Sequence, residues 1–201
     1  KTAKIVGISS VTILALLFVT PLIFSDKIKE EIKKTANKKL SGEMNYSDAS
    51  VSFFKHFPSL TITLNDFSLT GSAPFQKENL IKAQETTFGI NLTSLIFGKS
   101  IKIDEIYLSN SIINIKVNKE GQANYNVYIA EKEAETKEDD ASAIKLDHIE
   151  IINSQLVYDD QSTQLHLDVF GFNYLGSGDL SQEVFDLYSK ATPLGGTIQF
   201  E

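Results

Sequence analysis

The sequence predicts a mainly β protein, in which an N-terminal transmembrane helix is followed by a curved antiparallel β-sheet. Three observations carry this prediction. Residues 5–24 are uncharged and mostly apolar, the chain after residue 43 alternates between apolar and polar residues, and this alternation recurs along the chain. Roughly twenty apolar residues span the ~30 Å hydrocarbon core of a bilayer, whereas a period of two places apolar side chains on one face of a strand.

The N-terminal apolar run lacks the small-residue cleavage site of a secretory signal peptide. We therefore interpret residues 1–24 as an uncleaved transmembrane signal anchor, with a cleaved signal peptide as the alternative. Lysines flank the run on both sides and are more numerous after it. Because long folded domains cross membranes largely regardless of such charges, charge alone leaves the orientation open.

Residues 25–42 are expected to form a juxtamembrane helix. Ser25 or Asp26 can cap its start, and Gly42 is a suitable stop. The helix carries a narrow apolar stripe formed by Ile28, Ile32, Ala36 and Leu40. One interpretation is a solvated stalk whose stripe rests on the following domain. The other is a basic collar whose lysines contact acidic lipid headgroups.

Residues 43–201 are predicted to form one β domain that continues beyond the last residue of the sequence. Within it, a turn at 118–121 is expected to lead into a further strand at 125–129. A short helical turn is expected at 93–97. The segment 131–143 is rich in charge and has no apolar periodicity, so we expect a disordered acidic loop there.

The domain is organised around residues 101–117, where the apolar alternation shifts phase between Ile103 and Ile106. Such a shift is typical of a β-bulge or a sharp bend. The same broken pattern begins again 43 residues later, at Ile144, and a fainter copy starts at Leu64, 39 residues before Ile103. Three copies of one strand, bulge and strand unit predict a repeating β architecture.

Composition and motif content argue against several functions. A net charge of −7 provides no basic face for phosphates, so nucleic acid is not an expected partner. The absence of cysteine excludes disulfides, iron–sulfur clusters and cysteine nucleophiles. His56, His148 and His166 lack metal-ligand spacing, and the pair Asp159 and Asp160 at a strand end is typical of a turn. We therefore expect no metal, no cofactor and no enzymatic activity.

Each repeated unit has one apolar face, and no long amphipathic helix follows Gly42 in the sequence to cover it. The sheet can close on itself as a sandwich with a dry core, or it can curve into a trough whose lining meets lipid. Burying an isoleucine is worth about 1.5–3 kcal/mol in either case, so this energy does not distinguish them. The lining of such a trough would be Ile62, Leu64, Ile103, Ile106, Leu108, Ile115, Leu146, Ile149 and Ile151.

A series of short motifs resembles one protein family. The motifs are DKIK at 26–29, VSFF at 51–54, FPSL at 57–60, PF at 74–75, LTSL at 92–95, GK at 98–99, VNKEGQANY at 117–125 and YDD at 158–160. In order and spacing they are similar to the N-terminal region of AsmA-family proteins of Gram-negative bacteria. The resemblance implies an inner-membrane anchor and a periplasmic, taco-like repeating β-groove of the bridge-like lipid transfer type. Family members usually run longer, so this chain would form only the beginning of a bridge.

We therefore expect a single-pass inner-membrane protein whose main domain lies in the periplasm. Its groove would bind the acyl chains of phospholipids and help move them toward the outer membrane, with a role in outer-membrane assembly. Other envelope proteins are further expected partners. The alternative is a structural or adaptor subunit of an envelope complex, with a dry core and a protein partner. An anchored hydrolase would need a catalytic site that the sequence does not offer.

Overall fold

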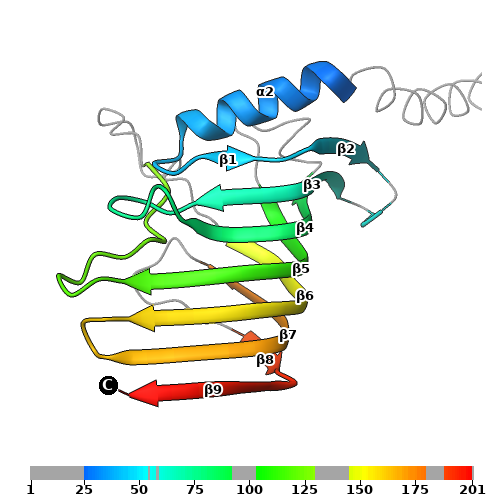
Figure 1. Ribbon diagram of the computed structural model, residues 1–201. Helices are drawn as coiled ribbons and strands as arrows, with labels where there is room; N and C mark the ends of the chain where they lie inside the picture. Colours follow the sequence, from blue (N-terminus) through cyan, green and yellow to red (C-terminus); the bar gives the residue numbers. More distant parts are fainter. Residues whose placement is uncertain are drawn as a thin grey trace, which may run out of the picture.

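A computed structural model describes residues 25–53, 55–57, 59–91, 103–129, 145–179 and 188–200 of the chain. These residues form one β-sheet with a helix at one end of it (Figure 1). The described elements are α2 (Ser25–Lys38), β1 (Met44–Asn45), β2 (Asp48–Ser52), β3 (Leu60–Thr70), β4 (Asn79–Ile90), β5 (Ile103–Val117), β6 (Lys145–Asp160), β7 (Leu165–Asp179), β8 (Tyr188–Thr192) and β9 (Gly195–Phe200). The prediction of a mainly β fold is confirmed.

Three predicted segments lie outside the described residues: the anchor at 1–24, the helical turn at 93–97 and the acidic loop at 131–143. Within the described ranges, no helix combines the length and the apolar character needed to cross a membrane. The helix expected after the anchor does form, since α2 begins at Ser25 and ends at Lys38. The transmembrane anchor itself stays a prediction.

The helix α2 packs on the sheet through its apolar stripe. Ile32 and Ala36 of α2, and Leu40 just after it, contact a cluster of buried residues. The buried residues of that cluster are Met44, Ala49, Leu64, Phe67, Ala83 and Leu108. The apolar stripe of α2 therefore rests on the β domain, which agrees with the interpretation of this helix as a stalk packed on the following domain.

The nine described strands form one open sheet. Strands β1 and β2 both pair with β3, and the order then runs β3–β4–β5–β6–β7. Strands β8 and β9 both pair with β7, so they share the far edge. Because the path of pairings does not return to its start, the sheet does not close into a barrel (Figure 1).

The prediction of an antiparallel sheet is wrong at one place, because β5 and β6 are parallel. Ile106 lies opposite Ile149, and Leu108 lies opposite Ile151. A parallel pair needs a crossover connection of about a dozen residues or more, and the 27 residues at 118–144 provide it. All other strand pairs are antiparallel among the described residues.

The predicted turn at 118–121 forms, but the strand expected after it does not join the sheet. The Gly121 N–H donates to the Asn118 carbonyl at 3.0 Å, closing the turn. Both edges of β5 are already occupied by β4 and β6, so no free edge remains for another strand. The segment instead reaches the end of α2, where Tyr128 forms an isolated bridge with Leu40.

A line of left-handed residues crosses the sheet and marks where its strands bend. Asp66 of β3, Asn110 of β5, Asn153 of β6 and Gly171 of β7 have φ between 48° and 59°. Asn, Asp and Gly are the residues that adopt this conformation at the least cost. Figure 1 shows that the central strands turn round at one side of the molecule instead of lying in a plane.

The sheet bends with its apolar face on the inside. Ala83, Ser111 and Ser154, which are small, are buried beside the bend, whereas Asp66 and Asn110 are exposed. A contact across the bend agrees with this. The Phe67 ring meets the Phe88 ring edge-on at 6.3 Å, although Phe88 lies five residues along β4 from Ala83, the partner of Phe67. In a flat sheet five residues would span about 16 Å.

Both bulges predicted in the repeated units are confirmed. In β5 the pairing with β4 shifts by one residue between Ile103 and Glu105. In β6 the pairing with β7 shifts between Leu146 and Ile149. Each shift adds one residue to the strand and so brings the apolar side chains before and after it to the same face of the sheet. Ile103 therefore lies on the same face as Ile106, and Leu146 lies on the same face as Ile149.

The offset predicted for the faintest copy is wrong. Leu64 of β3 pairs with Thr86 of β4, and Thr86 pairs with Leu108 of β5. Leu64 therefore lies level with Leu108, 44 residues on, and not with Ile103, 39 residues on. The apolar alternation alone allowed both alignments, whereas the bends at Asp66 and Asn110 match only the longer offset.

Candidate functional site

The strongest candidate site is the apolar face of the sheet. Ile62, Ile106 and Ile149 occupy one row across the strands, and Leu64 and Leu108 lie in the next. Cross-strand partners point to the same side, so register and alternation place all nine predicted lining residues on this face. The remaining four are Ile103 opposite Ile90, Ile115 opposite Tyr158, Leu146 opposite Gly178, and Ile151 opposite Tyr174.

Along the row that contains Leu64, exposure of the apolar face rises from the α2 end of the sheet to the β9 edge. Elsewhere on the face, Ile103 on β5 is 43% exposed and Leu146 on β6 is 4% exposed. Leu64 on β3 is 0% exposed and Leu108 on β5 is 7% exposed. In the same row, Ile151 on β6 and Tyr174 on β7 are only half-buried. On β9, Ile198 opposite Leu167 is 62% exposed. In this row the face is thus a dry core at one end and an incompletely covered surface at the other.

Coverage by other elements explains this gradient. The helix α2 packs against β1 and β2, at the first edge of the sheet. Among the described elements, β6 and β7 make extensive contacts only with their neighbours in the sheet. Half-buried side chains on the apolar side of β6 and β7, such as Ile151 and Tyr174, therefore keep part of their surface in water, at a cost of about 25 cal/mol per Å².

Polar side chains hold the bend on both sides of the sheet. On the outer side, Asn110 donates to the Gln84 side chain at 3.0 Å, and Asn153 donates to the Asn110 side chain at 2.7 Å. On the inner side, the buried hydroxyls of Ser111 and Ser154 are 2.7 Å apart and hydrogen-bonded. The pairs Asn110–Asn153 and Ser111–Ser154 each join equivalent positions of the two units, 43 residues apart. The repeated Asn-Ser dipeptide is the sequence signal for the bend.

The motif at 117–125 has a structural role that sequence reasoning missed. The Asn124 side chain is fully buried. Its oxygen accepts the Lys116 N–H at 2.9 Å, and its nitrogen donates to the Asn114 carbonyl at 2.6 Å. The Asn118 side chain accepts the Gln122 N–H at 2.8 Å. The motif therefore folds the start of the crossover onto the end of β5.

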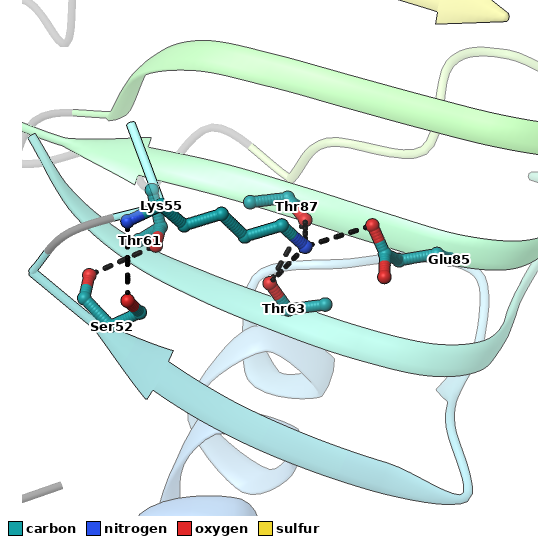
Figure 2. Close-up of polar contacts among 6 residues, drawn as sticks. All are labelled: Ser52, Lys55, Thr61, Thr63, Glu85 and Thr87. Carbon is teal, nitrogen blue, oxygen red and sulfur yellow. Dashed lines mark hydrogen bonds and ion pairs between the residues drawn. The ribbon is translucent and has the colours of Figure 1, made fainter. Parts of the chain in front are cut away.

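The opposite face is polar on β3 and β4, where Lys55 lies across it (Figure 2). Further along, the same face carries exposed apolar side chains at Ile112, Ile152, Phe170 and Leu175. The Lys55 ammonium donates to Glu85 at 2.9 Å, to Thr63 at 3.2 Å and to Thr87 at 3.4 Å. The Thr63 and Thr87 hydroxyls are 3.0 Å apart on neighbouring strands. Because Lys55 belongs to the connection between β2 and β3, these contacts attach that connection to the sheet.

The histidines lie where structural roles account for them. His56 stacks on Tyr107 with ring centroids 3.8 Å apart, and His148 lies on Tyr107 at 4.9 Å. Burial and the neighbouring Glu105 carboxylate raise the pKa of Tyr107. In the described part of the chain, no three His, Asp or Glu side chains are placed to hold a metal ion.

The acidic pair at the end of β6 forms a turn, as the sequence predicts. The Asp160 carboxylate accepts the Ser162 hydroxyl at 2.6 Å and the Ser162 and Thr163 N–H groups at 2.9 and 3.2 Å. These hydrogen bonds lower the pKa of Asp160 to about 2. His166 lies 3.9 Å from Asp159 on the facing strand.

Comparison with known proteins gave one match. The sequence model of the AsmA family matches residues 1–185. No curated protein and no solved structure matched the chain.

Proposed function

The chain belongs to the AsmA family, and on that premise we propose that it is a single-pass protein of the bacterial inner membrane that binds phospholipid acyl chains in its periplasmic β domain. It helps to move these lipids toward the outer membrane, and so serves outer-membrane assembly. It acts by binding, without catalytic residues or a cofactor. Membership of the family is consistent with a function in the cell envelope.

The observation that supports lipid binding best is the gradient of exposure on one continuous apolar face. A dry core needs no ligand, but the half-buried side chains on β6 and β7 have apolar surface left to cover. Each CH₂ group of an acyl chain that leaves water for such a surface contributes about 0.8 kcal/mol. The inner face of the bent sheet offers this contact on β6 and β7, where Ile151 and Tyr174 are half-buried.

The dimensions of the face suit an acyl chain. Five strands, β3 to β7, follow one another in the sheet. At about 4.8 Å per strand they extend roughly 19 Å, whereas one leaflet of a bilayer core is about 15 Å thick. The apolar face is therefore about as wide as one lipid tail is long, and a tail would find uncovered surface on its β6 and β7 part.

The test is to purify the full chain in mild detergent and to quantify bound phospholipid by mass spectrometry. Leu167→Asp places a charge on the apolar face of β7, and Ile112→Asp is the matched change on the polar face of β5. We expect wild type and Ile112→Asp to retain phospholipid, and Leu167→Asp to retain several-fold less while keeping its circular dichroism spectrum. Equal retention by the two variants, or no phospholipid on the wild type, contradicts the proposal.

A second candidate is an adaptor that binds a protein partner of the envelope. The observation that favours it is β9, which among the described strands pairs only with β7 and exposes 80% of Phe200. Edge strands of this kind accept a further strand from another chain. In that case the purified protein carries no phospholipid, and a charged substitution of Phe200 abolishes capture of the partner.

A further inference from the structure

We propose that residues 123–129, which we call the rim, hold the polar part of the bound phospholipid, with the hydroxyls of Tyr125 and Tyr128 contacting its glycerol esters and its phosphate. This inference rests on the proposed function, and it concerns the end of the lipid that an apolar face does not bind. Tyr125 is 53% exposed and Tyr128 is 47% exposed. The supporting observations are the fixed backbone of the rim, its position and its chemistry.

The rim is fastened at both of its ends. At the first end, the Ser72 hydroxyl donates to the Ala123 carbonyl at 2.8 Å, and the buried Asn124 side chain is hydrogen-bonded to β5. At the other end, the Ile129 N–H donates to the Lys39 carbonyl at 2.9 Å. Because the backbone between these contacts is fixed, little conformational freedom is lost when a ligand binds to the two tyrosines.

Tyr125 lies beside the open part of the apolar face. It follows Asn124, whose side chain bonds the backbone on both sides of Ile115. Ile115 lies opposite Tyr158 of β6, and Tyr158 lies opposite Leu167 of β7. All three of these side chains are only half-buried. Tyr125 therefore borders a row in which apolar surface is left for a lipid tail.

Tyr128 lies at the α2 end of the rim and points to the same side of the sheet. It forms an isolated antiparallel bridge with Leu40, and partners across a bridge point to one side. Leu40 packs on the buried cluster of the apolar face. Figure 1 shows the chain after β5 running along the side of the molecule to the C-terminal end of α2. The rim thus borders the apolar face from its covered part to its open part.

The side chains of the rim suit the boundary between the apolar and polar parts of a lipid. A tyrosine has an apolar ring and a polar tip, and it is favoured where one end of the side chain is apolar and the other is wet. Lys38 and Lys39, next to the Tyr128 end, are exposed, and Glu43 is the only acidic residue in the segment 38–43. Lysine and tyrosine both donate to phosphate oxygens, so a phospholipid suits the rim better than an uncharged lipid.

The Asp160 carboxylate at the Tyr125 end sets the direction of the lipid. It accepts the Tyr158 hydroxyl at 3.1 Å. Burial and this carboxylate raise the pKa of Tyr158, and the nearby Tyr125 adds to the increase. A phosphate beside Asp160 would be repelled. We therefore expect the uncharged glycerol esters at Tyr125 and the phosphate at Tyr128.

The absence of cysteine makes a direct test possible. A nitroxide spin label on Asn126→Cys, an exposed position between the two tyrosines, broadens the phosphorus-31 NMR signal of a nearby phosphate. Leu194→Cys is the matched control, because Leu194 is 82% exposed and lies between β8 and β9, at the far edge of the sheet. Each variant of the full chain is purified with its bound phospholipid in a maltoside detergent, which contains no phosphorus. We expect the label at 126 to broaden the signal several-fold more than the label at 194.

The double variant Tyr125→Phe/Tyr128→Phe tests the hydroxyls, because it removes both of them and keeps the rings. Tyr107→Phe is the control on the opposite face, where the Tyr107 hydroxyl donates to Glu105 at 3.1 Å. Mass spectrometry of the purified proteins should find several-fold less phospholipid on the double variant than on the wild type, and an unchanged amount on Tyr107→Phe. Circular dichroism checks that both variants are folded.

Failure of this inference is distinct from failure of the proposed function. Equal broadening by the labels at 126 and 194, or undiminished phospholipid on the double variant, overturns the rim as the site of the polar part and leaves lipid binding intact. A wild type that carries no phospholipid overturns the proposed function and this inference together.

Discussion

Leu64 and Leu167 lie on the same apolar face, yet their surroundings differ. Leu64 on β3 is fully buried in the cluster that α2 helps to cover. Leu167 on β7 is half-buried and lies opposite Ile198, which is 62% exposed. Strand periodicity is the same at both positions. Alternation therefore assigns a side chain to one face of the sheet, whereas the elements that pack on that face determine whether the side chain is buried.

The two ends of the apolar face therefore contribute to different properties of the protein. The α2 end contains the buried cluster, so its side chains determine the free energy of unfolding. The β7 to β9 end leaves apolar surface available, so its side chains are free to contribute to binding. Substitutions that are chemically alike should then have large effects on folding at one end and small effects at the other.

The largest expected effect is at Leu64. Leu64→Ala removes buried methyl groups and leaves a cavity, which typically costs about 2–5 kcal/mol in the free energy of unfolding. Leu167→Ala, the matched change, removes a side chain that is already partly in water and should cost about 1 kcal/mol. Urea denaturation followed by circular dichroism measures both values. Equal losses would mean that the face is closed along its whole length.

The second-largest effect on stability is expected at the buried side-chain amide of Asn124. Asn124→Ala leaves the Lys116 N–H and the Asn114 carbonyl without their partner, which should cost about 1–3 kcal/mol. Asn126→Ala, at an exposed position two residues on, should change stability by no more than about 0.5 kcal/mol. Thermal denaturation of the two variants compares them. A neutral Asn124→Ala would show that the turn after β5 does not fix the crossover.

A smaller effect is expected at the bend. Asn110 has φ of 48°, and an alanine there should cost about 1–2 kcal/mol because its side chain disfavours this conformation. Asn110→Gly keeps the backbone but loses the hydrogen bonds to Gln84 and Asn153, so it should be less harmful than Asn110→Ala. Denaturant midpoints rank the two variants. If glycine is the worse of the two, side-chain hydrogen bonding dominates the bend.

The smallest effect is a pH dependence at the open end. The pKa of Asp160 is about 2 in the folded protein, lowered mainly by the Ser162 hydroxyl, against about 3.9 for an unperturbed aspartate. The folded state therefore binds fewer protons, so this contribution is complete above about pH 4 and is lost as the pH falls toward 2. Asp160→Asn should show a shallower loss of stability between pH 4 and pH 2 in urea titrations. Parallel curves for the two proteins would rule this contribution out.

Periodicity was sufficient to predict the apolar face and its irregularities. All nine residues predicted as the lining fall on one face, because the alternation and the phase shift after Ile103, repeated 43 residues later, were both visible in the sequence. The turn after Asp160 was also predictable, since acidic side chains favour such positions. These features depend on residues close together in the chain.

Features that depend on distant residues were not predictable in this way. Alternation carries no information on strand direction, so the parallel pairing of β5 and β6 was missed. Curvature of the sheet was predicted, but the position of the bend was not, because the left-handed conformation of Asn110 and Asn153 is set by pairing across the sheet. The gradient of coverage depends on where α2 packs, which no strand pattern encodes.

The central claim is that the open part of the apolar face holds lipid, and β7 offers the most direct test of it. Tyr174 lies on the apolar face, level with Ile151, whereas Phe170 of the same strand lies on the polar face, opposite Gly195. Each is replaced in turn by photoreactive benzoylphenylalanine, the protein is irradiated in native membranes, and its intact mass is measured. The account predicts phospholipid adducts at position 174 and none above background at position 170. Equal adducts at the two positions, or none at position 174, would contradict it.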